Sequence, residues 1–169
     1  PWGNPLTSEE LYFDNTADWN NPNYQYISDN ERLQYYLGGT YPNPYDYGYI
    51  VEITDPTAAT PIPVKLRALG RFSHENAVVM PDEKTVYLSD DGTGTVFFKF
   101  IADNAGDLTS GTLYAAKATQ DDTSDPTVAG FDIDWIELAS GDNATIESWI
   151  ADYDGIDHSD YTDGSTSSI

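Results

Sequence analysis

The residues best suited to chemistry lie in one short segment, Gly70 to Glu75, which reads Gly-Arg-Phe-Ser-His-Glu. Arg71 is one of three arginines in the chain and His74 is one of two histidines. Arginine binds phosphate through paired hydrogen bonds, while histidine and glutamate serve as acid–base groups or metal ligands. The segment is therefore a candidate catalytic or metal site. A surface salt bridge beside a histidine with satisfied hydrogen bonds explains the same residues.

Two pairs of adjacent carboxylates are further candidates. Glu9 and Glu10 follow Ser8, and in an extended segment their side chains point to opposite faces, so that one can face a site. The alternative is the acidic start of a helix. Asp90 and Asp91 stand at the end of an expected strand, before a glycine. This arrangement suits a hard cation such as calcium, and it is also ordinary turn chemistry.

A fourth candidate is the acidic segment near the C-terminus. Asp152, Asp154 and Asp157 follow the pattern Asp-x-Asp-Gly-x-Asp, which resembles calcium loops but lacks the glutamate that closes an EF-hand. The alternative is a solvated acidic loop. Nucleophile-elbow, phosphate-cradling glycine-loop and zinc-protease motifs do not occur in the chain. The absence of cysteine excludes disulfides, thiolate catalysis and cysteine-based metal sites.

The composition limits the classes of molecule that the protein can bind. The chain has 29 acidic and 7 basic residues and a net charge of −22, so it repels nucleic acid and anionic membranes. The aromatic fraction of 14% argues against disorder, which leaves cation binding and a saline or extracellular setting. No apolar run is long enough to span a bilayer, so we expect a soluble protein without membrane insertion. Because it starts at Pro1, we expect a mature or truncated chain.

The elements that must position these residues are short strands within a single domain over residues 1–169. The segments expected as strands are 47–53, 63–70, 75–80, 85–90, 95–100 and 112–117. Residues 31–37 follow a capping sequence and predict a short helix in a long loop. Residues 133–139 predict a strand, 145–151 a helical turn or strand, and 151–169 an Asp-rich loop or tail.

The spacing of these strands predicts an all-β fold. Short strands about ten residues apart, joined by Gly, Pro and Asp, are typical of propellers, sandwiches and barrels. A propeller blade takes about 40–45 residues in compact repeats, so the chain holds two to three blades, too few to close a ring. A propeller here would be a partial one with long loops.

The order of the segments resembles the PhoX-type alkaline phosphatase family from residue 1 to about residue 120, with weaker similarity in the tail. The blocks that carry the resemblance are Pro1–Gly3, Leu6–Glu10, Tyr47–Ile53, Pro63–Lys65, Ala68–Glu75, Val86–Asp91, Phe98–Phe100 and Gly111–Lys117. The resemblance implies a fragment of a six-bladed β-propeller with a metal cluster at one mouth of the ring. It also implies hydrolysis of small phosphate esters outside the cytoplasm, in an extracellular or periplasmic setting, with iron and several calcium ions.

The same resemblance implies roles for individual residues. Carried over by position, Glu9 or Glu10, Glu75 and the pair Asp90-Asp91 correspond to metal ligands. Arg71 and His74 correspond to supporting or substrate-facing groups.

One departure from the family pattern concerns iron. The family's iron-binding phosphatases have a cysteine ligand where this chain has Ser8, which suggests a branch with serine in place of cysteine. A serine hydroxyl stays protonated near neutrality and is a far weaker ligand than a thiolate. We therefore expect calcium, with a weaker case for iron. The alternative function is a calcium-stabilised structural or binding propeller without catalysis, and a carbohydrate-active propeller rests only on aromatics and carboxylates.

Overall fold

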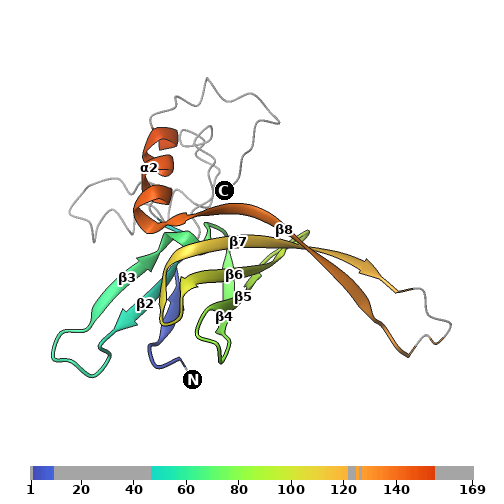
Figure 1. Cartoon of the computed structure of the whole chain (residues 1–169), viewed down its shortest axis with the longest axis horizontal. Coiled ribbons are helices and arrows are strands. Elements are labelled where there is room, and N and C mark those ends of the chain that lie inside the picture. The colour runs from blue at the N-terminus through green and yellow to red at the C-terminus, as the bar shows by residue number, and fades with distance from the viewer. Residues whose placement is uncertain (1, 10–46, 122–124, 126, 155–169) are drawn as a thin grey trace, which may run out of the picture.

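The computed structural model describes residues 2–9, 47–121, 125 and 127–154, and it is mostly β-strand (Figure 1). One antiparallel sheet has the order β1 (Leu6–Ser8), β2 (Ile50–Thr54) and β3 (Ile62–Leu66). The second has the order β4 (His74–Val79), β5 (Thr85–Asp90), β6 (Phe97–Asn104), β7 (Asp107–Gln120) and β8 (Phe131–Asp142). A 3-10 turn, η3 (Arg67–Leu69), joins the sheets, and helix α2 (Asn143–Asp154) follows β8.

The second sheet is an antiparallel meander whose strands alternate between a core face and an outer face. Val86 and Leu88 of β5 are fully buried, as is Phe100 of β6, while the residues between them are partly exposed. Leu88 is in register with Phe98 across the β5–β6 hairpin. Gly111 in β7 has no room for a side chain, because a Cβ there would overlap the Ile101 carbonyl oxygen. Only glycine allows β6 and β7 to pair this closely at that position.

The core lies between the two sheets and is closed by η3. The buried apolar residues that form it are Ile50, Leu66, Ala68, Leu69, Phe72, Val86, Leu88, Phe98, Phe100, Ala102, Leu108 and Leu113. Each large apolar side chain buried in this way contributes about 1.5–3 kcal/mol to folding. The packing therefore fixes the segment from β3 to β4, which carries the candidate residues, against both sheets.

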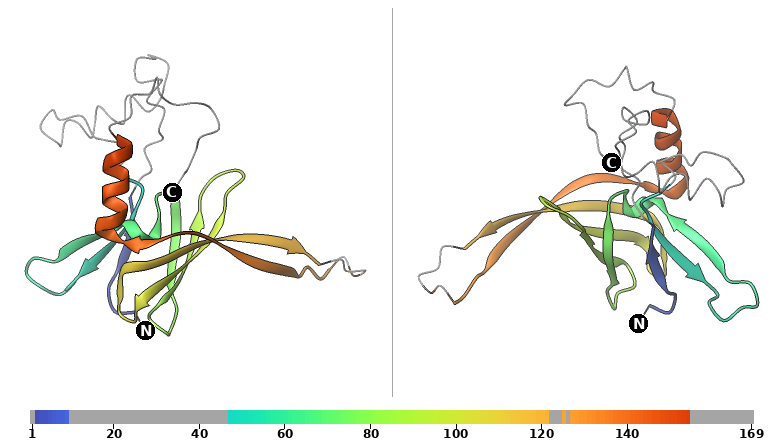
Figure 2. Two further views of the ribbon diagram at one scale, coloured as in Figure 1. Left: turned by 45° about the horizontal axis from the view of Figure 1, so that its top comes forward. Right: turned by 180° about the vertical axis from the view of Figure 1, so that it is seen from behind.

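Strands β7 and β8 continue beyond the rest of the sheet as a two-stranded arm (Figures 1 and 2). Phe131 and Ile133 near its far end are 55% and 44% exposed. Within the part of the chain that the structure describes, these side chains lie outside the buried core.

The predicted strands are largely confirmed, and β5 has the predicted bounds. The strand expected over 63–70 was wrong beyond Leu66, because the backbone turns into η3, where the Ala68 N–H bonds to the Asn143 side chain and the Gly70 N–H to the Arg67 carbonyl. The helical alternative for 145–151 is confirmed. A loop from residue 151 was wrong as far as Asp154, which is still helical. The helix expected at 31–37 lies outside the described residues.

Candidate functional site

The candidate residues gather at one end of the two sheets, which we call the site end. In the first sheet, Ser8, Ile50 and Leu66 are in register there. In the second sheet, His74 and Asp90 are in register at the corresponding end of β4 and β5. Three candidate segments from the sequence therefore lie in the same region. They are the segment that follows Ser8, the segment Arg71–Glu75, and the pair Asp90-Asp91.

The short segment Gly48-Tyr49 joins the two halves of the site end. The Glu9 N–H donates to the Tyr49 carbonyl at 2.9 Å, and the Phe72 N–H donates to the Gly48 carbonyl at 3.2 Å. These bonds place the end of β1 on one side of the segment and the start of the Arg71–Glu75 run on the other.

Glu9 directly follows strand β1, and its N–H donates to the Tyr49 carbonyl. The choice between an extended Glu9-Glu10 pair and an acidic helix start stays a prediction, because the residues after Glu9 lie outside the described ranges. The Glu9 side chain is 20% exposed, and Oε1 lies 3.0 Å from the Lys65 ammonium. Oε2 is buried and has no hydrogen-bond partner among the described residues. An unpaired buried carboxylate oxygen costs free energy, so this atom is suited to binding a cation. Glu10 lies outside the described residues.

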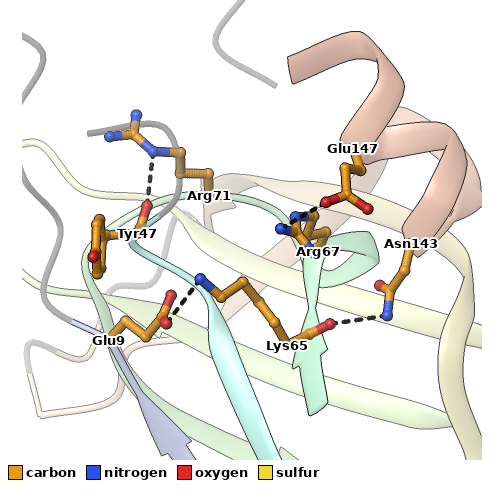
Figure 3. A network of polar contacts seen from close by, with 7 residues as sticks. All are labelled: Glu9, Tyr47, Lys65, Arg67, Arg71, Asn143 and Glu147. Atoms are coloured by element: carbon orange, nitrogen blue, oxygen red, sulfur yellow. Dashed lines mark hydrogen bonds and ion pairs between the residues drawn. The ribbon is translucent and has the colours of Figure 1, made fainter. Parts of the chain in front are cut away.

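Arg71 follows Gly70, which has a φ of +88°. A Cβ at Gly70 would lie 2.7 Å from the Leu113 side chain, so glycine alone allows the chain to turn here from η3 towards β4. The Arg71 Nε then donates to the Tyr47 carbonyl at 2.9 Å. Figure 3 shows this bond, which ties the Arg71 side chain to the segment before β2.

His74 is 6% exposed and lies against the Phe72 ring, with 3.6 Å between ring centroids. Its Nε2–H donates to the Gly70 carbonyl at 3.0 Å, while Nδ1 is buried without a hydrogen-bond partner among the described residues. Burial lowers the pKa of His74 from 6.5 to about 4, against a smaller opposing effect of the Gly70 hydrogen bond. The imidazole is therefore neutral near pH 7 and holds the Gly70–His74 turn closed.

Glu75 is exposed and occupies a β-bulge. His74 pairs with Asp90 and Asn76 pairs with Ser89, so that Glu75 is the extra residue on β4. Because of this extra residue both His74 and Ala77 face the core, while Glu75 and Asn76 face outwards. Bulges occur often beside active sites, where they redirect a side chain.

Asp90 and Asp91 adjoin the start of β4. Asp90 is half-buried and opposite His74 in the register, whereas Asp91 is exposed and its N–H donates to the Ser73 carbonyl at 2.8 Å. The structure therefore brings Asp90 and Asp91 beside the Arg71–Glu75 segment, although about fifteen residues separate them in sequence.

The C-terminal acidic candidate is only partly described. The backbone of Asp152 and Asp154 belongs to helix α2, and Asp157 lies outside the described residues. Helix α2 contacts η3 at the site end.

A polar network that the sequence did not reveal connects helix α2 to β3 and η3 at the site end (Figure 3). The Asn143 amide donates to the Lys65 carbonyl at 2.9 Å and its oxygen accepts from the Ala68 N–H at 3.0 Å. Arg67 forms an ion pair of 3.0 Å with Glu147 on helix α2. One signal was present in the sequence: three of the seven basic residues lie within positions 65–71.

No group of three His, Asp or Glu side chains in the described ranges is arranged to hold a metal ion. The unpaired Glu9 Oε2 nevertheless fits a hard cation, which prefers carboxylate oxygen. Separately, no helix among the described residues is long and apolar enough to cross a membrane.

The comparison with protein families gives a match to the alkaline phosphatase PhoX family over residues 1–165. No curated protein and no solved structure matches the chain. The match covers the site end, both sheets, helix α2 and nearly all of the sequence between and beyond them. The chain therefore belongs to the PhoX alkaline phosphatase family.

Proposed function

We propose that this protein is a metal-dependent phosphatase that hydrolyses small phosphate esters outside the cytoplasm. The family match over residues 1–165 carries the proposal. The gathering of Glu9, Arg71, Glu75 and Asp90 at the site end supports it. The net charge of −22 disfavours polyanionic substrates, and the lack of cysteine is compatible with an extracellular or periplasmic setting.

The residues of the site end have distinct roles in this proposal. Glu9, Glu75, Asp90 and Asp91 would each supply a carboxylate ligand to calcium, and further ligands would come from Glu10 and from the acidic segment Asp152, Asp154 and Asp157. Bound metal ions would supply charge neutralisation of the phosphoryl oxygens and an activated water. Arg71, whose Nε donates to the Tyr47 carbonyl, would be the cationic group that faces those oxygens.

His74 has a supporting role rather than a direct one. It is buried, neutral near pH 7 and bonded to Gly70. These properties favour a residue that orients Glu75 over one that transfers a proton to substrate.

We further propose that the two sheets are blades of a six-bladed β-propeller, and that residues 1–169 are the N-proximal part of that single domain. The meander β4–β5–β6–β7 is a four-stranded antiparallel unit in chain order, as a propeller blade requires.

The test is phosphatase activity of the purified protein supplied with calcium and iron, with a generic phosphomonoester as substrate. We expect Glu75→Gln to lower kcat at least about a hundredfold, because a lost metal ligand removes charge stabilisation of the transition state. Glu137→Gln changes an exposed glutamate of β8 away from the site end and should leave kcat unchanged. Unchanged activity in Glu75→Gln, with folding intact, would contradict the assignment.

The second candidate is a calcium-stabilised structural or binding propeller without catalysis. It is favoured by Ser8, which occupies the position of the family's iron-binding cysteine and whose side chain is exposed. Elemental analysis of the purified protein separates the two candidates. Iron together with calcium favours the phosphatase, whereas calcium without a transition metal favours the structural protein.

A further inference from the structure

The two oxygens of the Glu9 carboxylate are in different environments. Oε1 lies 3.0 Å from the Lys65 ammonium, and the side chains of Lys65 and Glu9 are only 23% and 20% exposed. Oε2 is buried and has no hydrogen-bond partner among the described residues. One oxygen thus contacts a cation supplied by the protein, while the other is left for a different partner.

Lys65 is fixed from several directions. It lies on β3 in register with Val51 of β2, and its carbonyl accepts the Asn143 amide at 2.9 Å. Its ammonium lies 5.3 Å from the centre of the Tyr47 ring and 5.6 Å from that of Tyr49. The positive charge is therefore held beside Glu9 by the backbone pairing and by cation–π contacts.

We propose that Lys65 is a positioning residue and an internal counter-cation for Glu9. It orients the carboxylate so that Oε2 is available to a metal ion, and it compensates the carboxylate charge when no metal ion is bound. A half-buried carboxylate without a counter-charge destabilises the fold, while an ammonium group close to a divalent cation repels it. Lys65 thus stabilises the metal-free protein and lowers the affinity of the site for the metal ion. This inference rests on the proposed function, in which Glu9 is a metal ligand.

The test compares Lys65→Gln with wild type, using metal-stripped protein. Calorimetric titration with calcium gives the affinity, and thermal unfolding in EDTA and in calcium gives Tm in each state. We expect Lys65→Gln to have a lower Tm in EDTA and to bind calcium about tenfold more tightly, because the repulsion is removed while an N–H donor remains.

Three further variants isolate the charge at this position. Lys65→Arg keeps the charge, so its calcium affinity and its Tm in EDTA should stay close to those of wild type. Lys117→Gln removes one positive charge from an exposed position on the β7–β8 arm and should leave calcium affinity unchanged. Lys65→Met keeps the aliphatic stem beside the tyrosine rings but removes both the charge and the N–H donor to Glu9. It should bind calcium more tightly than wild type but less tightly than Lys65→Gln, because Glu9 loses the group that orients it.

The outcomes separate this inference from the function on which it rests. A wild-type protein that shows no calcium binding overturns the proposed metal site. A wild type that binds calcium, with neutral Lys65 variants that bind it equally or more weakly, overturns only the role of Lys65. A neutral variant that folds in calcium but not in EDTA supports that role.

Discussion

His74 and Glu75 are adjacent in sequence, yet their side chains have opposite environments. The His74 ring is 6% exposed and bonded to Gly70, while Glu75 is exposed on a bulge. The Gly70–His74 bond closes the turn just before the bulge, so it fixes the position from which Glu75 projects. A change at His74 is therefore expected to act on Glu75 through the backbone.

The buried imidazole makes stability depend on pH. The pKa of His74 is about 4 in the folded chain against 6.5 as its ordinary value. Between these two values the unfolded chain binds more protons, so the stabilisation is complete above pH 6.5 and is lost as the pH falls towards 4. Going from about pH 7 to about pH 4.5 in EDTA should remove on the order of 2 kcal/mol through this residue.

The measurement is urea unfolding of wild type and His74→Gln at both pH values. Glutamine keeps an N–H donor for the Gly70 carbonyl but does not titrate. The loss of unfolding free energy on acidification should be smaller in His74→Gln than in wild type. Equal losses in the two proteins would show that His74 does not cause the pH dependence.

At the scale of elements, helix α2 braces the turn that leads into the candidate site. The Asp142 carboxylate accepts the Thr145 N–H at 2.7 Å and so caps the helix. Hydrogen bonds from the Thr145 side chain and backbone hold the pKa of Asp142 below its ordinary value. The Asn143 side-chain amide then joins the first turn of the helix to β3 and η3: its nitrogen donates to the Lys65 carbonyl and its oxygen accepts from the Ala68 N–H.

Removing the Asn143 side chain should destabilise the protein. Asn143→Ala leaves the Lys65 carbonyl and the Ala68 N–H unpaired in a half-buried region, and the cost should be about 2–3 kcal/mol of unfolding free energy. Chemical denaturation measures this loss. Asn104→Ala, at an exposed position in β6, should change the free energy by less than about 0.5 kcal/mol. Similar effects of the two substitutions would contradict the bracing role.

The sequence predicted the elements better than it predicted their contacts. In β5, the alternation around Val86 and Leu88 between two turn signals was enough to give the strand bounds. The same alternation continues through residues 67–69, where a 3-10 turn forms instead and the Ala68 N–H donates to the distant Asn143 side chain. Local pattern carries no information about a partner 75 residues away in the chain.

The same limit applies to the candidate site. Glu9, Glu75 and Asp90 were found from residue type and from resemblance, whereas the Lys65–Glu9 ion pair and the bulge at Glu75 depend on strand register. Register is set by pairing between segments far apart in sequence. The roles of the candidate residues therefore stay predictions, while their placement at one end of the sheets comes from the fold.

The large negative net charge of the chain destabilises the compact folded state. A net charge of −22 is distributed over 169 residues, so the folded chain repels itself. Salt screens such repulsion, because the Debye length falls from about 30 Å at 0.01 M to about 3 Å at 1 M ionic strength.

Stability should therefore rise with ionic strength even without divalent cations. In EDTA, raising potassium chloride from about 0.01 M to about 0.5 M should increase Tm by several degrees, about 2–4 °C for each kcal/mol gained. Differential scanning calorimetry measures the shift. Neutralising Asp132 and Asp134, which are both exposed on β8, should reduce the salt response. A Tm that falls with salt would contradict this interpretation of the charge.

The two hydrogen bonds of Asn143 also bear on how the protein should be produced. Asn143-Ala144-Thr145 is an acceptor sequence for N-linked glycosylation. The amide nitrogen that would carry the glycan is the one that donates to the Lys65 carbonyl in the folded chain. A sugar attached before folding would occupy the contact between helix α2 and the β3–η3 turn. Bacterial expression, or a Thr145 substitution in a eukaryotic secretory host, avoids that modification.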